Sequence, residues 1–404
     1  MLISVFNGAG QVDYLFGLIS GLAEHSKKPV HVLDSDAAAP LLQQMDNVIF
    51  HQVYSFKESK ASTWRKLKNI IRFYRLQLGY LIKSKPGIVH FQWLNRQLFA
   101  DRIIIPLVAR LFGHKMVLTV HNINTASRDE HDSIINRISL RILYHLCHHL
   151  IVHTPGSRDE LIEHFSIDPA KIDVIRHGTN NKVQITRLTS PEARNILNLS
   201  ANSRVVLFFG NIDHYKGLDI ILDSLKQLPA DFCQNLTLII AGQAKSKEYD
   251  EFIKKKISDV SDSVHVNIIQ KLTFIPDEDI EIYFKAADCI VLPYRKIYQS
   301  GIIFMAYAFG LPILASDTGN FRNDIPENKC GYIVKENTSK VWAESLLSYF
   351  DSSLFSQLKS NRIEIKKWAD DYYSWEQIGS ETLSVYSNLK KKSQSGLKAT
   401  LKLF

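Results

Sequence analysis

The 404-residue sequence has few cysteines and no long apolar run. No stretch of about eighteen apolar residues occurs, and the start MLISVFNGAG has no basic flank, so we expect neither a membrane-spanning helix nor a secretory signal and predict a cytoplasmic protein. The cysteines are far apart and three of them lie in apolar runs, which argues against a disulfide framework or a zinc site and predicts reduced, structural thiols. They are Cys147, Cys233, Cys289 and Cys330.

What is present indicates a folded chain of more than one domain. Apolar residues make up 45% of the sequence, and 404 residues correspond to two or three domains at about 150 residues each. The net charge of +8 favours an anionic partner. Composition alone does not distinguish nucleic acid, a lipid surface or a phosphorylated substrate.

The pattern along the chain predicts two α/β domains. Short β-branched runs such as LISVF, VHVL and LIVHT alternate with helical stretches, lose their periodicity between Asn180 and Ser203, and resume with RVVLFFG. We therefore predict two Rossmann-like parallel-sheet domains, residues 1–180 and 200–371, with a helix over 372–390 returning to the first domain. Because open α/β sheets bind ligands at the carboxyl ends of their strands, we expect the site in a central cleft that both domains face.

Two stretches of the second half are candidates for anion binding. In FFGNIDHYKG, Lys216 directly precedes a helix, where an ammonium group and free backbone N–H groups together suit a phosphate. In VLPYRKIYQSGIIF, the amides of Ser300, Gly301 and Ile302 open a helix, and Arg295 is a candidate for a bidentate contact. The alternatives are a solvated lysine and an ordinary capped helix.

These stretches, with LIIAG, AFGLPILASDTGN and CGYIV, resemble the donor-binding half of the family-four retaining glycosyltransferases, which have the GT-B fold. The first half resembles the family more weakly, through FNGAGQVDYLFGLISGLA, TVHN and RHGTN. The resemblance implies an acceptor-binding first domain and a nucleotide-sugar-binding second domain. It assigns the donor diphosphate to Lys216, the glycine-rich loop of Gly8 and Gly10 to the donor from the first domain, and His121 to the transferred sugar.

The sequence departs from the family pattern at three positions. Asn211 follows the strand glycine where the family usually has an arginine, and Arg295 is the candidate replacement. Ile297 and Met305 occupy the places of two glutamates that usually contact the donor sugar and the ribose. Because some exopolysaccharide-type members carry a similar SG loop, we favour an altered donor grip. Around the nucleobase and ribose we place Gly242, Met305 and Phe274, with a core phenylalanine as the alternative for Phe274.

The implied reaction separates a sugar from a nucleoside diphosphate, so the protein must stabilise negative charge on the leaving phosphate. Lys216, Asn211, Arg295 and the Ser300–Ile302 backbone are the groups that we assign to this task. A DxD-like acidic pair is missing from a matching loop, so we predict a metal-independent enzyme without a cofactor. The resemblance implies retention of the anomeric configuration, and we choose a UDP-sugar as the donor because it is the most frequent one. For His121 the alternative is a buried histidine bonded to backbone.

A basic segment and two histidine motifs suggest further roles. Residues 57–85 hold nine Lys or Arg residues against Glu58, with Trp64, Leu67, Ile71, Tyr74, Leu78 and Leu81 at helical spacing. Such a helix suits an anionic membrane and a lipid-linked acceptor, or packs its apolar stripe on its own sheet. HLCHHL offers metal-ligand types, but in a helix only His145 and His149 share a face, and we predict no metal site. His177 is a possible cleft-facing group.

The sequence thus favours a glycosyltransferase that transfers a sugar to a glycan or lipid-linked acceptor in surface or exopolysaccharide synthesis. A sugar-nucleotide epimerase with the same architecture is one alternative, and it would need acid and base carboxylates in the cleft. A protein that binds nucleotide sugars without turnover is another, suggested by Ile297 and Met305. Nucleic-acid binding is disfavoured because no recognition motif accompanies the basic segment.

Overall fold

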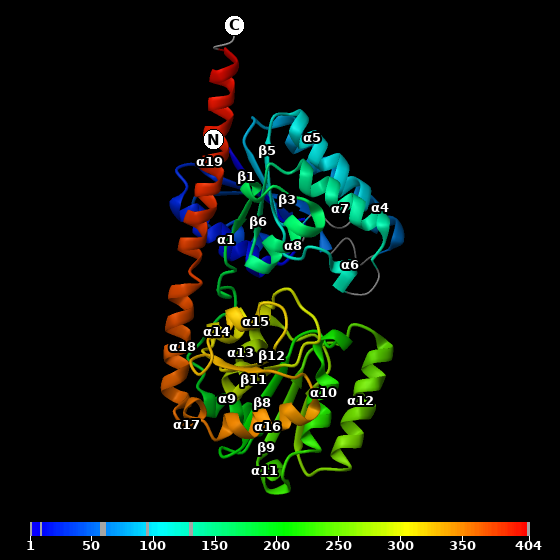
Figure 1. The fold of residues 1–404 in the computed structure, drawn as a ribbon, viewed down its shortest axis with the longest axis vertical. Helices are drawn as coiled ribbons and strands as arrows, with labels where there is room; N and C mark the ends of the chain where they lie inside the picture. Colours follow the sequence, from blue (N-terminus) through cyan, green and yellow to red (C-terminus); the bar gives the residue numbers. More distant parts are fainter. Residues whose placement is uncertain (1, 9, 57–61, 94–96, 129–131, 402–404) are drawn as a thin grey trace. The chain divides into compact units, whose positions relative to one another are not determined.

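The structure is a computed structural model that describes residues 2–8, 10–56, 62–93, 97–128 and 132–401, with side chains up to residue 391. The chain divides into two compact units (Figure 1). The first contains residues 1–178 and 373–404, and the second contains residues 179–372. Each unit contains its own parallel β-sheet, as the two series of short apolar strands predict.

The first unit is built on a seven-stranded parallel sheet in the order β3-β2-β1-β4-β5-β6-β7. Its central strands are buried along their whole length, because helices cover both faces, which explains why they are apolar without alternation. The strands are β1 (Ile3–Phe6), β2 (Val30–Ser35), β3 (Val48–Tyr54), β4 (Ile88–Phe91), β5 (Lys115–Thr119), β6 (His149–Val152) and β7 (Ile172–Val174).

Because neighbouring strands of this sheet are parallel, the chain crosses from one strand to the next through helices. The helices are α1 (Val12–His25), α2 (Ala39–Leu42), α4 (Thr63–Lys83), a π-helical turn η1 (Ala100–Ile104), α5 (Ile105–Leu111), α6 (Thr125–Arg128), α7 (Ile134–Leu146), α8 (Pro155–Phe165), a 3₁₀ turn η2 (Pro169–Lys171) and α19 (Trp375–Leu401). The C-terminal helix α19 packs along α1 (Figure 1). A methyl group on Gly21 would lie 2.0 Å from the carbonyl oxygen of Trp375, so glycine permits this close packing.

The second unit has a six-stranded parallel sheet in the order β10-β9-β8-β11-β12-β13. Its strands are β8 (Arg204–Phe209), β9 (Leu236–Ala241), β10 (Asn267–Lys271), β11 (Cys289–Leu292), β12 (Ile313–Ser316) and β13 (Gly331–Val334). Its helices are α9 (Ser190–Ile196), a 3₁₀ turn η3 (His214–Lys216), α10 (Leu218–Leu225), α11 (Ala230–Gln234), α12 (Lys247–Ser261), α13 (Asp277–Ala286), α14 (Gly301–Ala308), α15 (Phe321–Asp324), α16 (Ser339–Phe350), α17 (Ser353–Ser356) and α18 (Leu358–Tyr372).

The segment around residue 190, which the sequence suggests as a link, belongs to the second unit. The buried carboxylate of Glu281 accepts a hydrogen bond from the backbone N–H of Thr186 at 2.7 Å. Lys285 donates to the carbonyl oxygens of Thr186 and Leu188. These charged groups of α13 bind the polar backbone of the segment, an attachment that hydrophobic periodicity does not reveal.

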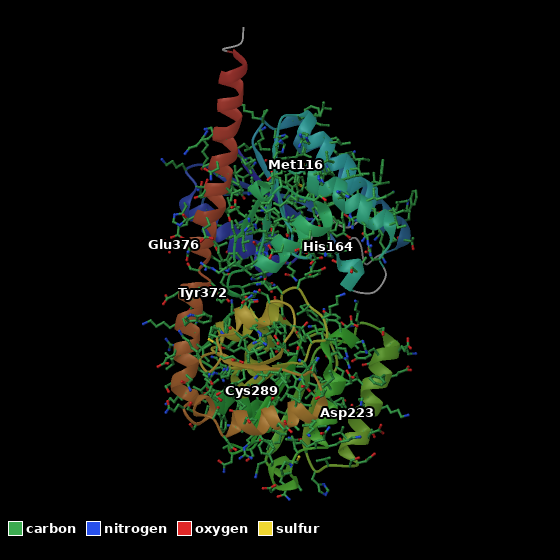
Figure 2. All side chains as sticks on the ribbon, in the orientation of Figure 1. Met116, His164, Asp223, Cys289, Tyr372 and Glu376 are labelled. Atoms are coloured by element: carbon green, nitrogen blue, oxygen red, sulfur yellow. The ribbon has the colours of Figure 1, made fainter. Side chains whose placement is uncertain are left out.

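The cysteines are reduced and buried, as the sequence predicts. Cys289 begins β11 inside the second unit (Figure 2). Cys147 ends α7 with extended backbone angles, so the helix expected to continue through HLCHHL stops at Leu146, and His149 begins a strand. The expectation of one helical face shared by His145 and His149 was therefore wrong.

Candidate functional site

In the second unit, Lys216 turns its ammonium group toward the end of β8. The residue is only 7% exposed, and a methyl group added at Gly210 would lie 3.2 Å from its Nζ and 3.3 Å from Cδ1 of Ile302. The Lys216 ammonium also lies 5.2 Å from the ring centroid of Tyr294, within reach of a cation–π contact. Lys216 and Gly210 thus meet Ile302, which is far from both in the sequence, at one edge of the sheet. The alternative of a lysine in bulk solvent was wrong.

Two glycines with left-handed or unusual backbone angles make this arrangement possible. Gly217 has φ +70°, and a methyl group there would lie 2.0 Å from the carbonyl oxygen of Pro293. Gly242, assigned to the nucleobase and ribose by the sequence, has φ +149°, and a methyl group there would lie 1.9 Å from the carbonyl oxygen of Gly210. Gly242 therefore lets the turn after β9 pack on the turn after β8, which gives this glycine a structural role.

The helix α14 begins beside Lys216. Ser300 is its N-cap, and the first amides of a helix have no carbonyl partner within it, which here applies to Gly301 and Ile302. A methyl group on Gly301 would have no heavy atom within 4 Å, so the space over this first turn is open. Burial raises the pKa of Tyr294 to about 12, and the Ser300 side chain lowers it in opposition. At neutral pH Tyr294 is thus an uncharged phenol under the Lys216 ammonium.

Arg295 is used differently from the sequence expectation. Its guanidinium donates to both carboxylate oxygens of Asp219, at 2.9 and 2.6 Å, and to the carbonyl oxygen of His214 at 2.6 Å. Its own N–H donates to the carbonyl oxygen of Tyr215 at 2.7 Å. The bidentate contact suggested for a diphosphate is therefore made to Asp219. It ties the loop after β11 to the turn that contains Lys216.

The remaining predicted residues of this unit are distributed between surface and core. Asn211 is exposed directly after Gly210, and Phe274 is 69% exposed after β10, so the alternative of a core phenylalanine was wrong. Met305 is buried in α14. Ile297 is half-buried, and its carbonyl oxygen would lie 2.3 Å from a methyl group on Gly319. Neither of these two side chains offers a charge to a ligand.

In the first unit, the glycine-rich loop packs on an aromatic ring. A methyl group on Gly8 would lie 2.7 Å from the carbonyl oxygen of Trp93, and one on Gly10 would lie 1.7 Å from the indole Cδ1. Ala9, which stands between these two glycines, lies outside the described residues. The indole of Trp93 stacks on the imidazole of His121, with ring centroids 4.6 Å apart and an interplanar angle of 10°. The glycine-rich loop and His121 therefore both pack against Trp93.

His121 belongs to a row of polar side chains that follow neighbouring strands. Gln92 follows β4, His121 follows β5, His153 follows β6 and His177 follows β7. Nε2 of His121 lies 3.2 Å from Oε1 of Gln92, and Nδ1 of His121 lies 3.1 Å from Nε2 of His153. The row ends where Nδ1 of His153 lies 2.8 Å from the carbonyl oxygen of Ile175.

Counting protons fixes the tautomers of this row. The Ile175 carbonyl only accepts, so Nδ1 of His153 carries a proton and its Nε2 accepts from Nδ1–H of His121. Nε2 of His121 then carries no proton and faces Oε1 of Gln92, which is also an acceptor. With both imidazoles neutral, no proton is left for a hydrogen bond between these two atoms. A half-turn of the Gln92 amide supplies the missing N–H and turns Oε1 toward Nε2 of His90, which lies 3.1 Å from the amide nitrogen.

Burial keeps these imidazoles neutral. It lowers the pKa of His153 to about 4, opposed by the hydrogen bond to Ile175. It lowers the pKa of His177 and of His90 to about 3, with His153 adding to the effect on each. The pKa of His121 lies well below its ordinary value, first through burial and then through His153, His177 and His90. The site therefore presents hydrogen-bond donors and acceptors without positive charge.

Sequence reasoning missed Trp93, Gln92, His153 and the aromatic partners of the row. Tyr14 contacts His121, His153 and His177, with ring centroids 4.6, 5.3 and 4.9 Å apart. One signal was present in the sequence. In each of TVH, LIVH and VIRH, a histidine stands within a few residues of the end of a predicted strand, and these histidines are His121, His153 and His177. Since parallel strands end at the same edge of a sheet, this pattern could have predicted that the three histidines lie together, a prediction that the sequence analysis did not make. The packing of Tyr14 and Trp93 leaves no comparable pattern.

The HLCHHL histidines diverge. Nδ1 of His145 bonds the carbonyl oxygen of Arg141, Nδ1 of His148 accepts from the N–H of Met116, and Nε2 of His149 lies 2.7 Å from the Asp173 carboxylate. Throughout the part of the chain that the structure describes, His, Cys, Asp and Glu form no group of three able to hold a metal ion. In the same part, no helix has the length and hydropathy needed to cross a bilayer.

Family models match both halves of the chain. Residues 8–182 match the model "Glycosyltransferase Family 4", and residues 189–367 match "Glycosyl transferases group 1". Among curated relatives, D-inositol 3-phosphate glycosyltransferase of Mycobacteroides abscessus is 26% identical over 65% of this chain and 58% of its own length. The enzyme of the same name from Corynebacterium efficiens is 24% identical over 73% of this chain and 68% of its own length.

Solved structures share the fold at low sequence identity. Sucrose-phosphate synthase from Thermosynechococcus elongatus has a TM-score of 0.75 and 15% identity, over 97% of this chain and 100% of that one. Anabaena HepE in complex with UDP and glucose has a TM-score of 0.71 and 16% identity, over 96% and 100%. WaaG, described as a glycosyltransferase of lipopolysaccharide biosynthesis, has a TM-score of 0.65 and 14% identity, over 95% and 99%.

Proposed function

Because the chain belongs to the family-four glycosyltransferases and has the GT-B fold, we propose that it transfers a sugar from a nucleoside diphosphate sugar to an acceptor hydroxyl. The observation that carries this proposal is the buried Lys216, whose ammonium group lies beside Gly210 and the open first turn of α14. A cation and unpaired amides at one sheet edge suit the phosphates of a leaving nucleotide. No protein carboxylate or metal is needed for that role.

We propose a uridine nucleotide as the leaving group. Its support is the fold shared with HepE, which is described in complexes with UDP and with UDP-glucose. In this assignment Lys216 and the amides of Gly301 and Ile302 contact the diphosphate, and exposed Phe274 offers its ring face to the base. Arg295 holds the loop through Asp219 instead of contacting the phosphates.

In the first unit, we propose that His121 contacts the transferred sugar as a neutral hydrogen-bonding group. Its environment supports this, because burial keeps the ring uncharged while Trp93 and His153 fix its plane. The resemblance implies transfer with retention, in which the leaving phosphate accepts the proton of the attacking hydroxyl. Such a step needs no protein base, which distinguishes it from the acid and base carboxylates required by an epimerase.

Two acceptor classes remain as proposals. A glycan or lipid-linked acceptor in surface polysaccharide synthesis follows from the sequence resemblance, and we propose a cytoplasmic enzyme for that role. The names of the curated relatives favour a phosphorylated cyclitol instead. A charged soluble acceptor and a membrane-bound one differ in where the enzyme must work, so the two are separable by experiment.

The test is release of nucleoside diphosphate from UDP-, GDP- and ADP-sugars, with and without each acceptor class. We expect UDP release that depends on one acceptor class and is lost in Lys216→Ala. Formation of an epimeric sugar nucleotide without release would identify an epimerase instead. Tight UDP binding without turnover for any acceptor would favour the non-catalytic alternative.

A further inference from the structure

The outer face of three helices in the first unit carries exposed apolar side chains. Helix α5 packs against both α4 and α7, so the three form one layer over the sheet (Figure 1). Ile134 of α7 is 76% exposed, Leu111 of α5 is 80% exposed and Trp64 of α4 is 64% exposed. The other exposed apolar residues of these helices are Leu67, Ile71, Ile82, Leu107, Ile135, Ile138 and Ile142.

This face departs from the sequence expectation for α4. The apolar stripe predicted there divides, since Trp64, Leu67 and Ile71 are exposed whereas Leu81 is buried. The buried side of α4 consists of Asn69, Phe73, Gln77 and Leu81. The first turns of α4 therefore present apolar side chains to the outside, and the buried side of the helix runs from Asn69 to Leu81. Lys57, Glu58 and Lys60 of the basic segment lie outside the described residues.

Cations surround the apolar side chains. Helix α4 carries Arg65, Lys66, Lys68, Arg72, Arg75 and Lys83, α5 carries Arg110, and α7 carries Arg137 and Arg141. These three helices, all of whose residues are described, contain no Asp or Glu. Asp132, just before α7, pairs with Arg137 at 2.5 Å. In η1, the turn directly before α5, Asp101 is buried and accepts a hydrogen bond from the hydroxyl of Tyr74. The outward charge of the face is therefore positive.

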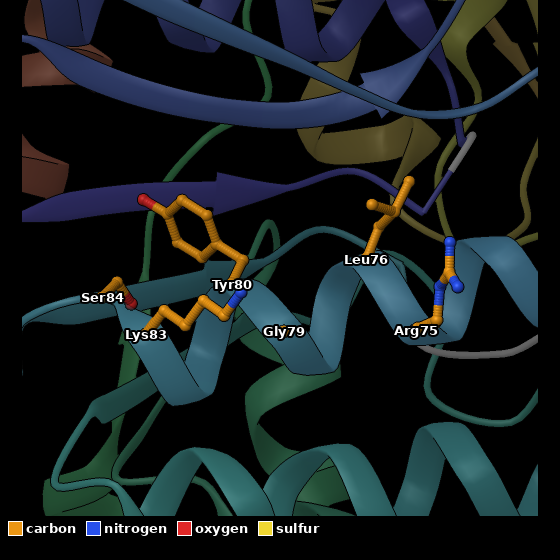
Figure 3. Close-up of a pocket in the computed structure, with 6 residues that line it drawn as sticks. All are labelled: Arg75, Leu76, Gly79, Tyr80, Lys83 and Ser84. Atoms are coloured by element: carbon orange, nitrogen blue, oxygen red, sulfur yellow. The ribbon is translucent and has the colours of Figure 1, made fainter.

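A groove along α4 adds to this chemistry. It has a volume of about 570 Å³ and is lined by Arg75, Leu76, Gly79, Tyr80, Lys83 and Ser84. Figure 3 shows Arg75 and Lys83 two turns apart on this helix, with Gly79 between them. The groove thus offers two cations over a stretch without a side chain, an arrangement that suits an anionic headgroup.

We propose that this face of α4, α5 and α7 is a docking surface for an anionic lipid bilayer, with the isoleucines and Trp64 entering the headgroup region and the cations meeting lipid phosphates. Apolar and basic side chains on one face are the combination that binds such membranes. A second copy of the chain fits less well, because two copies would bring the same positive charges together. The proposal is independent of the proposed reaction, since it concerns only where the protein binds.

The test is sedimentation of the full chain with vesicles of phosphatidylcholine alone or with about one third phosphatidylglycerol. We expect binding only to the anionic vesicles, weakened by added salt. I134Q/I138Q and K68Q/R75Q should each lower the vesicle partition coefficient by about tenfold. The matched controls are I363Q for the apolar change and K340Q/K359Q for the charge change. They alter exposed residues of the second unit and should bind as the wild type does.

Several results would overturn the proposal. The first is equal binding to both vesicle types, the second is binding by I134Q/I138Q at the wild-type level, and the third is no binding at all. A concentration-dependent dimer abolished by I134Q/I138Q would also contradict it, by identifying the face as a contact between copies. Circular dichroism of each variant shows that a loss of binding does not come from unfolding.

Discussion

The imidazole of His153 holds that of His121, with Nε2 of the former 3.1 Å from Nδ1 of the latter. His153 is in turn fixed by the carbonyl oxygen of Ile175 at 2.8 Å. The carbonyl sets the tautomer of His153, and His153 sets that of His121. The carbonyl group of Ile175, directly after β7, thus determines which nitrogen of His121 accepts a hydrogen bond.

We expect His153→Phe to lower kcat by roughly ten- to a hundredfold while UDP binding stays within a factor of two, because His121 loses its orientation and the donor phosphates keep their partners. Steady-state kinetics and calorimetry with UDP measure the two quantities. His145→Phe, which alters an exposed histidine of α7, is the control. An unchanged kcat in His153→Phe would show that His121 needs no support from it.

The buried histidines predict a loss of stability in mild acid. Their pKa values are lowered in the folded protein, to about 4 for His153 and about 3 for His90 and His177, whereas unfolded histidine titrates near 6.5. Below pH 6.5 the unfolded chain binds more protons, so the free energy of unfolding falls until the pH reaches the folded pKa values. Each histidine contributes at most about 1.4 kcal/mol per pH unit.

Denaturant unfolding between pH 7.5 and 5 measures this slope. His177→Phe removes one of these buried histidines and should make the slope shallower. Stability that is independent of pH in the wild type between 6.5 and 5 would contradict the account of neutral buried imidazoles.

The pair of Arg295 and Asp219 allows two roles of Arg295 to be separated. If the pair holds the loop, Arg295→Ala and Asp219→Asn should have similar effects, each costing about 1–2 kcal/mol of stability and weakening UDP binding to the same modest degree. If Arg295 instead binds the diphosphate, Arg295→Ala should weaken UDP binding and Asp219→Asn, which releases the guanidinium, should not. Calorimetry with UDP on both variants and their double mutant decides between the two.

The open first turn of α14 predicts a substitution that acts on the ligand alone. Gly301→Ala meets no heavy atom within 4 Å, so we expect the protein to fold with unchanged stability. A diphosphate against this turn would meet the new methyl group, and UDP binding should weaken by about tenfold. Gly156→Ala, at an equally open position in the first turn of α8, is the matched control. Wild-type UDP affinity in Gly301→Ala would place the diphosphate elsewhere.

Much of the fold was predictable because parallel sheets buried on both faces leave continuous apolar runs in the sequence. The position of Lys216 was also predictable, since the strand before Gly210 and the helix after Gly217 leave little room for the turn between them. The pairing of Arg295 with Asp219 was not predictable, because the two residues lie 76 positions apart and no local sequence pattern identifies the partner of an arginine.

In the first unit, too, contacts between residues far apart in the sequence were not predictable. The glycines of the N-terminal loop were recognised, but Trp93, whose carbonyl oxygen requires glycine at position 8 and whose indole requires it at position 10, comes from the end of another strand. For α4 the sequence left two alternatives open for a similar reason, an anionic membrane or the helix's own sheet, and it did not single out α5 and α7. Helical periodicity in α4 is compatible with a stripe that faces either the sheet or the outside, and only the packed structure shows where the stripe changes sides.

The central claim is that Lys216 binds the diphosphate of the donor, and calorimetric titration of UDP into Lys216→Ala tests it most directly. Removing a charged hydrogen-bonding partner should cost about 1.5–3 kcal/mol, so we expect the dissociation constant to rise by at least tenfold. The exposed Lys226→Ala, in the same unit, should bind UDP as the wild type does. A folded Lys216→Ala protein with wild-type UDP affinity would contradict the account.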